Sequence, residues 1–285
     1  MKYLKKYKLF ENVNKKEIHD ICKKYDIVNY IINSDGSIDV EGNVNLYNKG
    51  LTKLPIKFRN VSGVFYCYKN KLTSLKGSPT SVGGSFYCFN NQLISLEFAP
   101  NSVSGDFWCN DNNLTSLKGS PTSLGGFFYC NNNKLTSLEG APTTVGDDFW
   151  CQNNNLTSLK GSPTSVGGSF YCDNNNLTSL KGAPNGVGGN FDCSNNQITS
   201  LKGLEWKSFE RINLSNNPVY EIVKDWMNNE GREELIEYFI DMNVIQEGET
   251  KPRLVLPRLE AFHEEMELEM DIDFEEVKKY YEIIK

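Results

Sequence analysis

Cysteine is the residue type in this chain most suited to chemistry, because a thiolate is both a nucleophile and a metal ligand. The chain has eight cysteines, an even number that would suggest disulfides in a small secreted protein. Seven recur at intervals of 21 residues, at Cys67, Cys88, Cys109, Cys130, Cys151, Cys172 and Cys193. So regular an interval predicts stacked coils in which the seven side chains form one column.

The geometry of such a column argues against both kinds of cysteine chemistry. Neighbouring strands lie about 4.8 Å apart with parallel side chains, whereas a disulfide needs Cβ atoms about 3.8 Å apart and a crossed dihedral angle. Metal ligands must converge on one point, which a single file does not do. We therefore expect buried free thiols that act as small hydrophobic side chains, and no metal site.

No other residues suggest an enzyme. The two histidines, His19 and His263, are isolated, and Asp147 and Asp148 fall where a coil turns, so we expect these carboxylates to be solvated. The sequence contains no phosphate-binding glycine-rich loop, zinc-binding His-Glu-x-x-His motif or nucleophile elbow. We expect no catalytic activity and no cofactor.

The cysteines of the column share one local pattern, F-x-C-x-x-N-x-L-x-x-L, as in the copy from Phe149 to Leu159. A repeat of about 20 to 29 residues with apolar residues and an asparagine at these offsets is typical of a leucine-rich repeat. The frame extends upstream to Val44 and downstream to Asn217. The sequence therefore predicts a leucine-rich repeat solenoid of about nine coils over residues 44–217.

Alternation within the predicted strand of each coil assigns the inner and outer side chains. Phe65 and Cys67 point inward and Tyr66 outward, so phenylalanines and cysteines form the core under a parallel sheet on the concave face. The back of each coil should be extended or turned, without helices, because a proline recurs there. Paired glycines such as Gly83 and Gly84 are expected to supply the bend into the next strand.

A column of asparagines follows the strands and could be mistaken for a site. Its members are Asn70, Asn91, Asn112, Asn133, Asn154, Asn175, Asn196 and Asn217. A coil that turns at each strand end leaves buried backbone groups unpaired, and an asparagine amide can bond to them. We expect this column to be structural.

Two flanking segments are predicted to cap the solenoid. In residues 1–43, Asn14 and Glu17 have the spacing of a helix capping box. Two β-rich runs, 28–32 and 38–40, follow and are joined by an Asp-Gly turn, which predicts a hairpin that starts the sheet.

Residues 218–285 depart from the repeat. Pro218 suits a first helical position, and apolar residues at helical spacing predict three or four amphipathic helices. The net charge of the chain is −6, and the segment 258–285 accounts for it with ten acidic and four basic residues. We expect a helical C-terminal cap with an acidic tail, which could alternatively dock a basic partner.

Composition excludes other classes of partner and location. No basic face is visible, so we expect no nucleic-acid partner; the lysines at the extreme N-terminus, Lys2, Lys5, Lys6 and Lys8, are interpreted as a solvated terminus. No run of about 18 apolar residues exists, which argues against a membrane span, and the first residues lack a signal-peptide pattern. We expect a cytoplasmic monomer, in the producing cell or in a host cell.

The outward column of the predicted strands is the candidate binding site. Six successive coils place an aromatic residue there: Tyr66, Tyr87, Trp108, Tyr129, Trp150 and Tyr171. At about 4.8 Å per strand they form a stripe about 24 Å long. Polar residues border it at Asn110, Asn131, Gln152 and Asp173. Because Tyr and Trp dominate binding hot spots, we expect these residues to recognise a protein partner.

Three alternatives to protein binding remain open. Cross-strand stacking could simply stabilise the sheet, by about 0.2–1 kcal/mol per pair. The flat rings with neighbouring amides and carboxylates could instead bind a glycan. A separate ladder of exposed threonines has a regular spacing that could match an ice surface and bind it, although Ile94 and alternating Lys and Glu residues make this face irregular. The members of that ladder are Thr73, Thr115, Thr136, Thr157, Thr178 and Thr199.

The full motif, N-x-L-x-S-L-x-G-x-P-x-x-V-G-G-x-F-x-C, resembles the short bacterial-type leucine-rich repeats of secreted pathogen effectors. It is more similar still to the tandem leucine-rich repeat proteins of phages and large DNA viruses, as are the segments 38–46, 50–55 and 217–220 that enter and leave the repeats. The resemblance implies binding, because the effector members bind host proteins. Some effector relatives are ubiquitin ligases with a catalytic cysteine in a C-terminal domain; no cysteine follows Cys193, so that activity is not implied.

Overall fold

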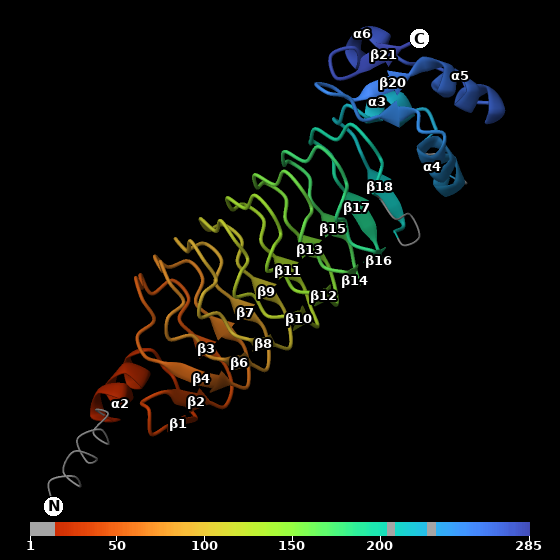
Figure 1. The fold of residues 1–285 in the computed structure, drawn as a ribbon. Coiled ribbons are helices and arrows are strands. Elements are labelled where there is room, and N and C mark those ends of the chain that lie inside the picture. The colour runs from red at the N-terminus through yellow and green to blue at the C-terminus, as the bar shows by residue number, and fades with distance from the viewer. Residues whose placement is uncertain (1–14, 204–208, 227–231) are drawn as a thin grey trace, which may run out of the picture.

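The computed structural model describes residues 15–203, 209–226 and 232–285. It is a rod of stacked coils with a helix and a hairpin at its N-terminal end and a small helical assembly at its C-terminal end (Figure 1). Asn14 of the expected capping box, and the lysines at positions 2, 5, 6 and 8, lie outside the described residues.

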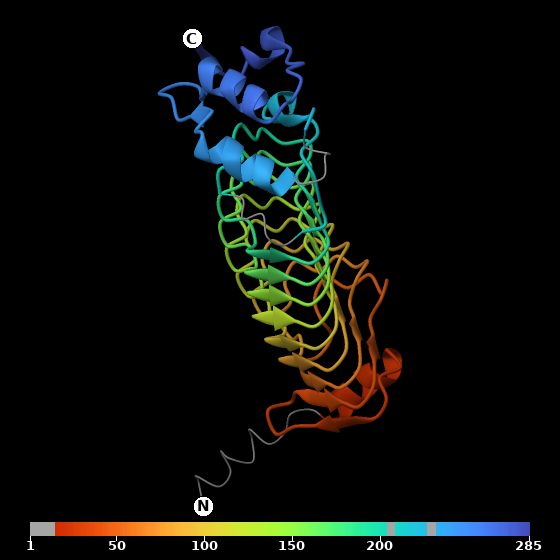
Figure 2. The same cartoon turned by 90° about the vertical axis from the view of Figure 1, so that its right-hand side faces the viewer.

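The strands that contain the Phe-x-Cys pattern form one nine-stranded parallel sheet, here called the front sheet. Its strands are β3 (Val44–Asn45), β5 (Phe65–Tyr66), β7 (Phe86–Tyr87), β9 (Phe107–Trp108), β11 (Phe128–Tyr129), β13 (Phe149–Trp150), β15 (Phe170–Tyr171), β17 (Asn190–Asp192) and β18 (Arg211–Asn213). Each strand is displaced by one repeat from the next, so Phe128 pairs with Phe107 and Phe149. Figure 2 shows these strands stacked along the rod.

A second nine-stranded sheet, here called the back sheet, runs along the segment of each coil that precedes the front-sheet strand, with two or three residues between them. It contains β1 (Tyr30–Ile32), β2 (Ile38–Val40), β4 (Phe58–Val61), β6 (Ser81–Val82), β8 (Ser102–Val103), β10 (Ser123–Leu124), β12 (Thr144–Val145), β14 (Ser165–Val166) and β16 (Gly186–Val187). The expectation of an extended back without helices is confirmed. The sequence analysis did not predict that the two-residue segments from β6 to β16 pair into a sheet.

The N-terminal segment continues this back sheet. Helix α2 (Lys15–Lys24) buries Ile18 and Cys22 against the core. Strands β1 and β2 form the expected antiparallel hairpin. The hairpin starts the back sheet rather than the Phe-x-Cys sheet, because Val40 pairs with Val61, and both belong to the column of buried aliphatic residues that continues through Val82.

Two aligned columns fill the core under the front sheet. The phenylalanine rings of successive coils stack with centroids 5.2–5.5 Å apart, and the column runs through Phe65, Phe86, Phe107, Phe128, Phe149, Phe170 and Phe191. The seven cysteines of the repeat are buried with no exposed surface and are free. Burying each phenylalanine side chain contributes roughly 1.5–3 kcal/mol, so this column is a major source of stability.

The buried asparagines tie each coil to the one before it. The side-chain Nδ2 of Asn154 donates to the carbonyl oxygens of Cys130 (3.1 Å) and Cys151 (3.0 Å), and its Oδ1 accepts from the backbone N–H of Leu135 (3.0 Å). Equivalent bonds recur from Asn70 to Asn217. The predicted structural role of this column is confirmed.

The residue before each buried asparagine has a left-handed backbone. Its φ is 51° at Lys69 and 55° at Asn153, and the other coils are similar. Asparagine and aspartate tolerate this conformation better than other non-glycine residues. This preference explains why most coils have two successive asparagines, of which only the second is buried.

The paired glycines allow the coils to approach one another closely. A Cβ atom added to Gly167 would lie 2.1 Å from the backbone oxygen of Gly146, and one added to Gly188 would lie 2.2 Å from that of Gly167. Such contacts cannot be relieved without moving backbone. The requirement for glycine at these positions is therefore steric, and the expected role in bending the chain is not the whole explanation.

The C-terminal end combines helices with a small sheet. The helices are α3 (Tyr220–Val223), α4 (Arg232–Asp241), α5 (Leu256–Glu265) and α6 (Phe274–Val277), and the strands are β19 (Ile245–Gln246), β20 (Arg253–Val255) and β21 (Glu282–Ile284). The sequence analysis predicted the helices but not the three strands. The acidic segment 258–285 is packed rather than free, since Tyr281 is 2% exposed and its hydroxyl donates to the backbone oxygen of Thr199 (2.7 Å). No helix in the described ranges is long and apolar enough to cross a membrane.

Replacing Asn154 with alanine tests the asparagine column. The change would leave the N–H of Leu135 and the carbonyls of Cys130 and Cys151 without this partner, so we expect the free energy of unfolding to fall by about 1–3 kcal/mol. Urea denaturation measures this change in the free energy of unfolding. Asn155→Ala is the matched control, because Asn155 is exposed and should change stability by less than about 0.5 kcal/mol. Equal unfolding midpoints for the two variants would contradict the structural role.

Phe98 offers a second stability test. It has a φ of 68° at a position where Gly77, Gly119 and the later coils have glycine, and its side chain is 50% exposed. A left-handed conformation costs a non-glycine residue about 1–2 kcal/mol. We therefore expect Phe98→Gly to raise the free energy of unfolding by about 1 kcal/mol. Glu97→Gly, which relieves no positive φ, should lower it by about 0.5–1 kcal/mol. A Phe98→Gly protein with a lower melting temperature would contradict the strain argument.

Candidate functional site

The six predicted aromatic residues form one continuous ladder on the outer face of the front sheet, here called the aromatic strip. Its members are Tyr66, Tyr87, Trp108, Tyr129, Trp150 and Tyr171, each half-buried. Neighbouring ring centroids are 4.7–5.5 Å apart. Strand register explains the ladder, because a repeat of constant length brings the same position of each coil side by side. The ladder ends in polar residues at Asn45 and Asp192.

A second aromatic column lies beside the strip at its N-terminal end, where the sequence also places Tyr68 and Phe89. Tyr47, Tyr68 and Phe89 form this column, with ring centroids 4.5 and 4.3 Å apart. Phe89 also approaches Trp108 (5.8 Å). The sequence analysis missed Tyr47, although it lies one repeat before Tyr68. At its C-terminal end the same column turns polar.

That polar part contains the other four predicted residues, Asn110, Asn131, Gln152 and Asp173. The structure places them in line beside the strip, each half-buried and two residues after its aromatic neighbour. The side-chain oxygens of the three amides are covered, and none has a hydrogen-bond partner among the described residues. Burial, followed by the charge of Asp192, raises the pKa of Asp173.

Two aspartates lie on the opposite border of the strip, held by backbone N–H groups. Asp106 Oδ1 accepts from the N–H of Phe127 (3.2 Å), and its Oδ2 accepts from the hydroxyl of Tyr87 (3.0 Å). Asp148 Oδ1 accepts from the N–H of Ser169 (2.7 Å) and its Oδ2 from Trp150 Nε1 (3.4 Å).

These carboxylates make the strip electronegative. Burial, followed by the charges of Asp148 and Asp106, raises the pKa of Tyr129 to about 12. Burial also raises the pKa of Tyr87, and Asp106 adds to that shift. The strip is therefore an apolar surface bordered by fixed negative charge.

The groups that could act as bases or nucleophiles lie away from the strip and apart from one another. His19 Nδ1 contacts the hydroxyl of Tyr30 (2.5 Å). His263 is buried in the C-terminal cap, where its Nδ1 contacts the backbone oxygen of Glu269 (3.0 Å) and burial lowers its pKa. Burial raises the pKa of the column thiols, for example Cys109 and Cys151. Within the described residues, no group of three or more His, Cys, Asp or Glu side chains is placed to hold a metal ion.

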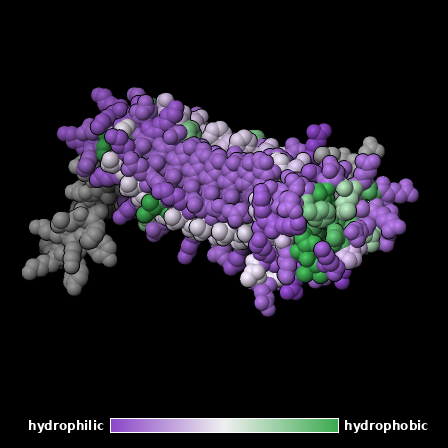
Figure 3. Space-filling model, turned by 90° about the horizontal axis from the view of Figure 1, so that it is seen from above, coloured by the Kyte–Doolittle hydropathy of each residue, from purple (hydrophilic) through white to green (hydrophobic). Residues whose placement is uncertain are grey.

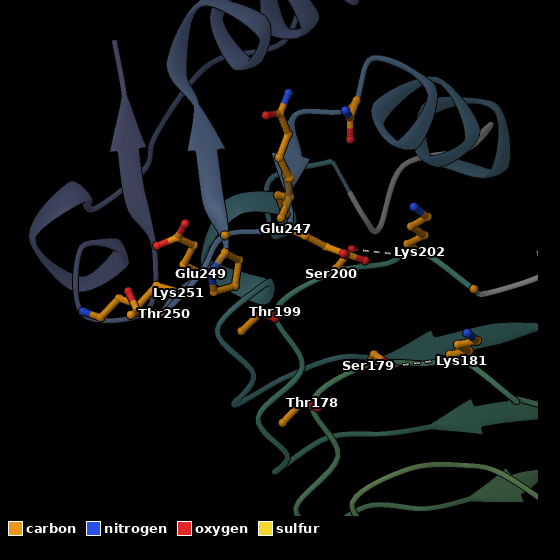
Figure 4. A pocket seen from close by; sticks show the side chains of 16 residues that line it. Thr178, Ser179, Lys181, Thr199, Ser200, Lys202, Glu247, Glu249, Thr250 and Lys251 are labelled. Carbon is orange, nitrogen blue, oxygen red and sulfur yellow. Dashed lines mark hydrogen bonds between the residues drawn. The ribbon is translucent and has the colours of Figure 1, made fainter.

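A cavity of about 690 Å³ lies between the last coils and the cap loop 243–252 (Figure 4). Hydroxyl and lysine side chains line it. Ser179 and Ser200 accept hydrogen bonds from the backbone N–H two residues later, and the same bond recurs at Ser74 and Ser116, outside the cavity. The polar wall of the cavity is thus the same surface that the repeat has elsewhere, and the cap loop covers it here.

Much of the remaining surface is polar. Figure 3 shows one long face of the rod covered mostly by hydrophilic residues in a regular array, with a hydrophobic area over the C-terminal end. The threonine ladder considered above is exposed from Thr73 to Thr178, but Ile94 interrupts it with 63% of its surface exposed. Among these exterior features, the aromatic strip is the one that combines apolar area with fixed charge.

Stacked 21-residue coils with an inward Phe-x-Cys strand, a buried asparagine and two inward leucines define the chain as a leucine-rich repeat solenoid. Comparisons with known proteins add little. No family model matches the chain, and no curated protein matches it. Among solved structures, the chain is similar to YopM from Yersinia enterocolitica WA-314, with 17% sequence identity and a TM-score of 0.35. The match covers 61% of this chain and 47% of that one, so it spans about half of YopM.

Thiol labelling tests the buried position of the cysteines. A colorimetric disulfide reagent should react with none of the seven column thiols in the folded protein, because burial excludes the reagent and raises the thiol pKa. After unfolding in denaturant, all eight cysteines of the chain should react. Rapid reaction of several thiols in native buffer would contradict the packing described here.

Proposed function

We propose that the protein is a non-enzymatic binding module that recognises a protein partner through the aromatic strip. The observation that supports this most strongly is the contrast between its two sheets. From β2 to β16 the back sheet pairs successive coils in the same parallel manner as the front sheet. Only the front sheet carries a ladder of aromatic residues on its outer face. At the corresponding positions the back sheet has Ser81, Ser102, Ser123, Thr144, Ser165 and Gly186.

This contrast weakens the alternative in which the strip merely stabilises the sheet. On the back sheet, serine and threonine at the outward positions are sufficient for the strands to pair. In addition, the phenylalanine column already supplies aromatic stacking between successive coils, beneath the strip. A second, outer ladder is therefore not required to hold the coils together, and half-exposed Tyr and Trp residues are typical anchors of binding surfaces.

The ring geometry favours a protein partner over a glycan. Trp108 and Tyr129 are nearly parallel (18°, 4.8 Å), as are Tyr129 and Trp150 (27°, 4.7 Å). Stacked rings cover each other's faces and present their edges outward. Sugars stack on open ring faces, whereas apolar side chains of a protein can pack against edges. Glycan binding is thus the second candidate, supported by the neighbouring amides and by the rings of Tyr87 and Tyr171, which are tilted by 66° and 65° to their tryptophan neighbours. Nucleic acid fits neither the ring geometry nor the acidic borders.

A pull-down tests the proposal. Bait protein with Trp108→Ala and Trp150→Ala should lose the proteins that the wild type captures, because truncating two central anchors costs about 2 kcal/mol or more each. The matched control is Ser123→Ala with Ser165→Ala, on the outer face of the back sheet, which should capture the same proteins as the wild type. Thermal melting of both variants establishes that they are folded.

Two outcomes would contradict the proposal. Capture of the same proteins by the tryptophan variant would show that the strip is not the binding surface. Specific signals on a glycan array that disappear in the tryptophan variant, without any captured protein, would replace the protein partner by a glycan.

A further inference from the structure

The aromatic strip lacks basic residues over most of its length. The six segments that contain strands β7 to β17 of the front sheet are 85–90, 106–111, 127–132, 148–153, 169–174 and 190–195. Together they hold five aspartates and no lysine or arginine. Basic side chains occur at the ends of the front sheet, at Lys69, whose Nζ lies over the ring of Tyr47 (5.6 Å), and at Arg211. The negative character therefore belongs to the part of the sheet that carries the two tryptophans.

The carboxylates border the strip on both sides. Asp106 and Asp148 lie along one side, two coils or about 10 Å apart. Asp173 lies on the other side, and Asp192 ends the ladder beyond Tyr171. A segment lying along the strip would thus meet carboxylates at intervals, with apolar ring edges between them.

The bordering carboxylates of this surface offer hydrogen-bond acceptors. Ionised carboxylates accept but do not donate, and Asp106 and Asp148 are already oriented by backbone N–H groups. Trp108 Nε1 is the one covered donor of the strip without a partner in the described structure. A ligand rich in donors satisfies such a surface better than one rich in acceptors.

The titration behaviour of the strip points the same way. Burial is the first cause of the raised pKa of Tyr129, and the charges of Asp148 and Asp106 are the next. Asp173 behaves similarly beside Asp192. Burial opposes a charge of either sign, whereas the neighbouring carboxylates oppose a further negative charge and favour a positive one.

We infer that the occupant of the strip is a basic segment of another protein, whose arginine or lysine side chains lie across the ring edges and reach the bordering aspartates. This inference rests on the proposed function and specifies the chemistry of its partner. Arginine and lysine combine a long apolar stem with a head that only donates, which matches an apolar centre with acceptors at its borders.

The attraction comes from the carboxylates rather than from the ring faces. Because the central rings are stacked, their faces are covered, and the outward edges carry the positive part of the ring quadrupole. Cation–π contacts are therefore not the basis of recognition at Trp108, Tyr129 and Trp150. This distinction makes the aspartates the residues to test.

The experiment uses the full chain and defined peptides. A fluorescent peptide of alternating arginine and threonine, about eight residues long so that it spans the strip when extended, is titrated by anisotropy. Peptides with glutamate or glutamine in place of arginine are compared with it. The protein variants are Asp106→Asn with Asp148→Asn, which keeps an oxygen for the backbone bonds, and Glu264→Gln with Glu269→Gln, which removes equal charge from the exposed surface of the C-terminal cap.

We expect the arginine peptide to bind more tightly than the other two. Its affinity should fall as the salt concentration is raised from about 50 to about 200 mM. The aspartate variant should bind it about fivefold more weakly, and the cap variant should bind as the wild type does. Absence of binding, equal binding of the three peptides, or equal affinity of the aspartate variant would overturn the inference. So would loss of affinity in the cap variant alone. If the tryptophan variant still loses its captured proteins in any of these cases, the proposed function stands without the basic partner.

Discussion

The hydrogen bonds of the buried asparagine column are the constraint on which the solenoid depends. Each amide bonds to the backbone of its own coil and of the preceding one, as Asn154 does with Cys151 and Cys130. These bonds satisfy backbone groups that the turn after each strand would otherwise leave buried and unpaired. They also fix neighbouring coils in a register of one repeat. The phenylalanine and cysteine columns can stack because this register does not slip.

The same register that builds the core also organises the exterior. A side chain one position from the buried cysteine is repeated in every coil, so any outward residue type becomes a ladder along the rod. On the back sheet the outward side chains are small and mostly polar, as at Ser123 and Ser165. On the front sheet it is aromatic and bordered by Asp106 and Asp148. We attribute this difference to recognition, because pairing of the coils is alike in the two sheets.

Repetition decided how much of this could be predicted from the sequence. The front sheet, the inward Phe65 and Cys67, the asparagine bonds and the outward aromatic column all follow from a constant spacing. The pairing of the back sheet could not be predicted from segments as short as Ser81–Val82, because their partners are set by the coils rather than by local propensity. Strands β19, β20 and β21 were missed for a related reason: β20 pairs with β21 across about thirty residues, and no repeat marks the pairing. The contact between Asp106 and Tyr87 could not be predicted, because it depends on side-chain conformations that the repeat does not fix.

The central claim, that the aromatic strip is covered when the protein binds its partner, is tested most directly by fluorine NMR of protein labelled with fluorotryptophan. The resonances are assigned by single Trp→Phe substitutions. On saturation with a protein captured by the wild type, the account predicts that the signals of Trp108 and Trp150 shift and lose their solvent isotope effect, while that of Trp226, buried in the C-terminal cap, stays in place. Unchanged signals from Trp108 and Trp150 in the saturated complex would contradict it.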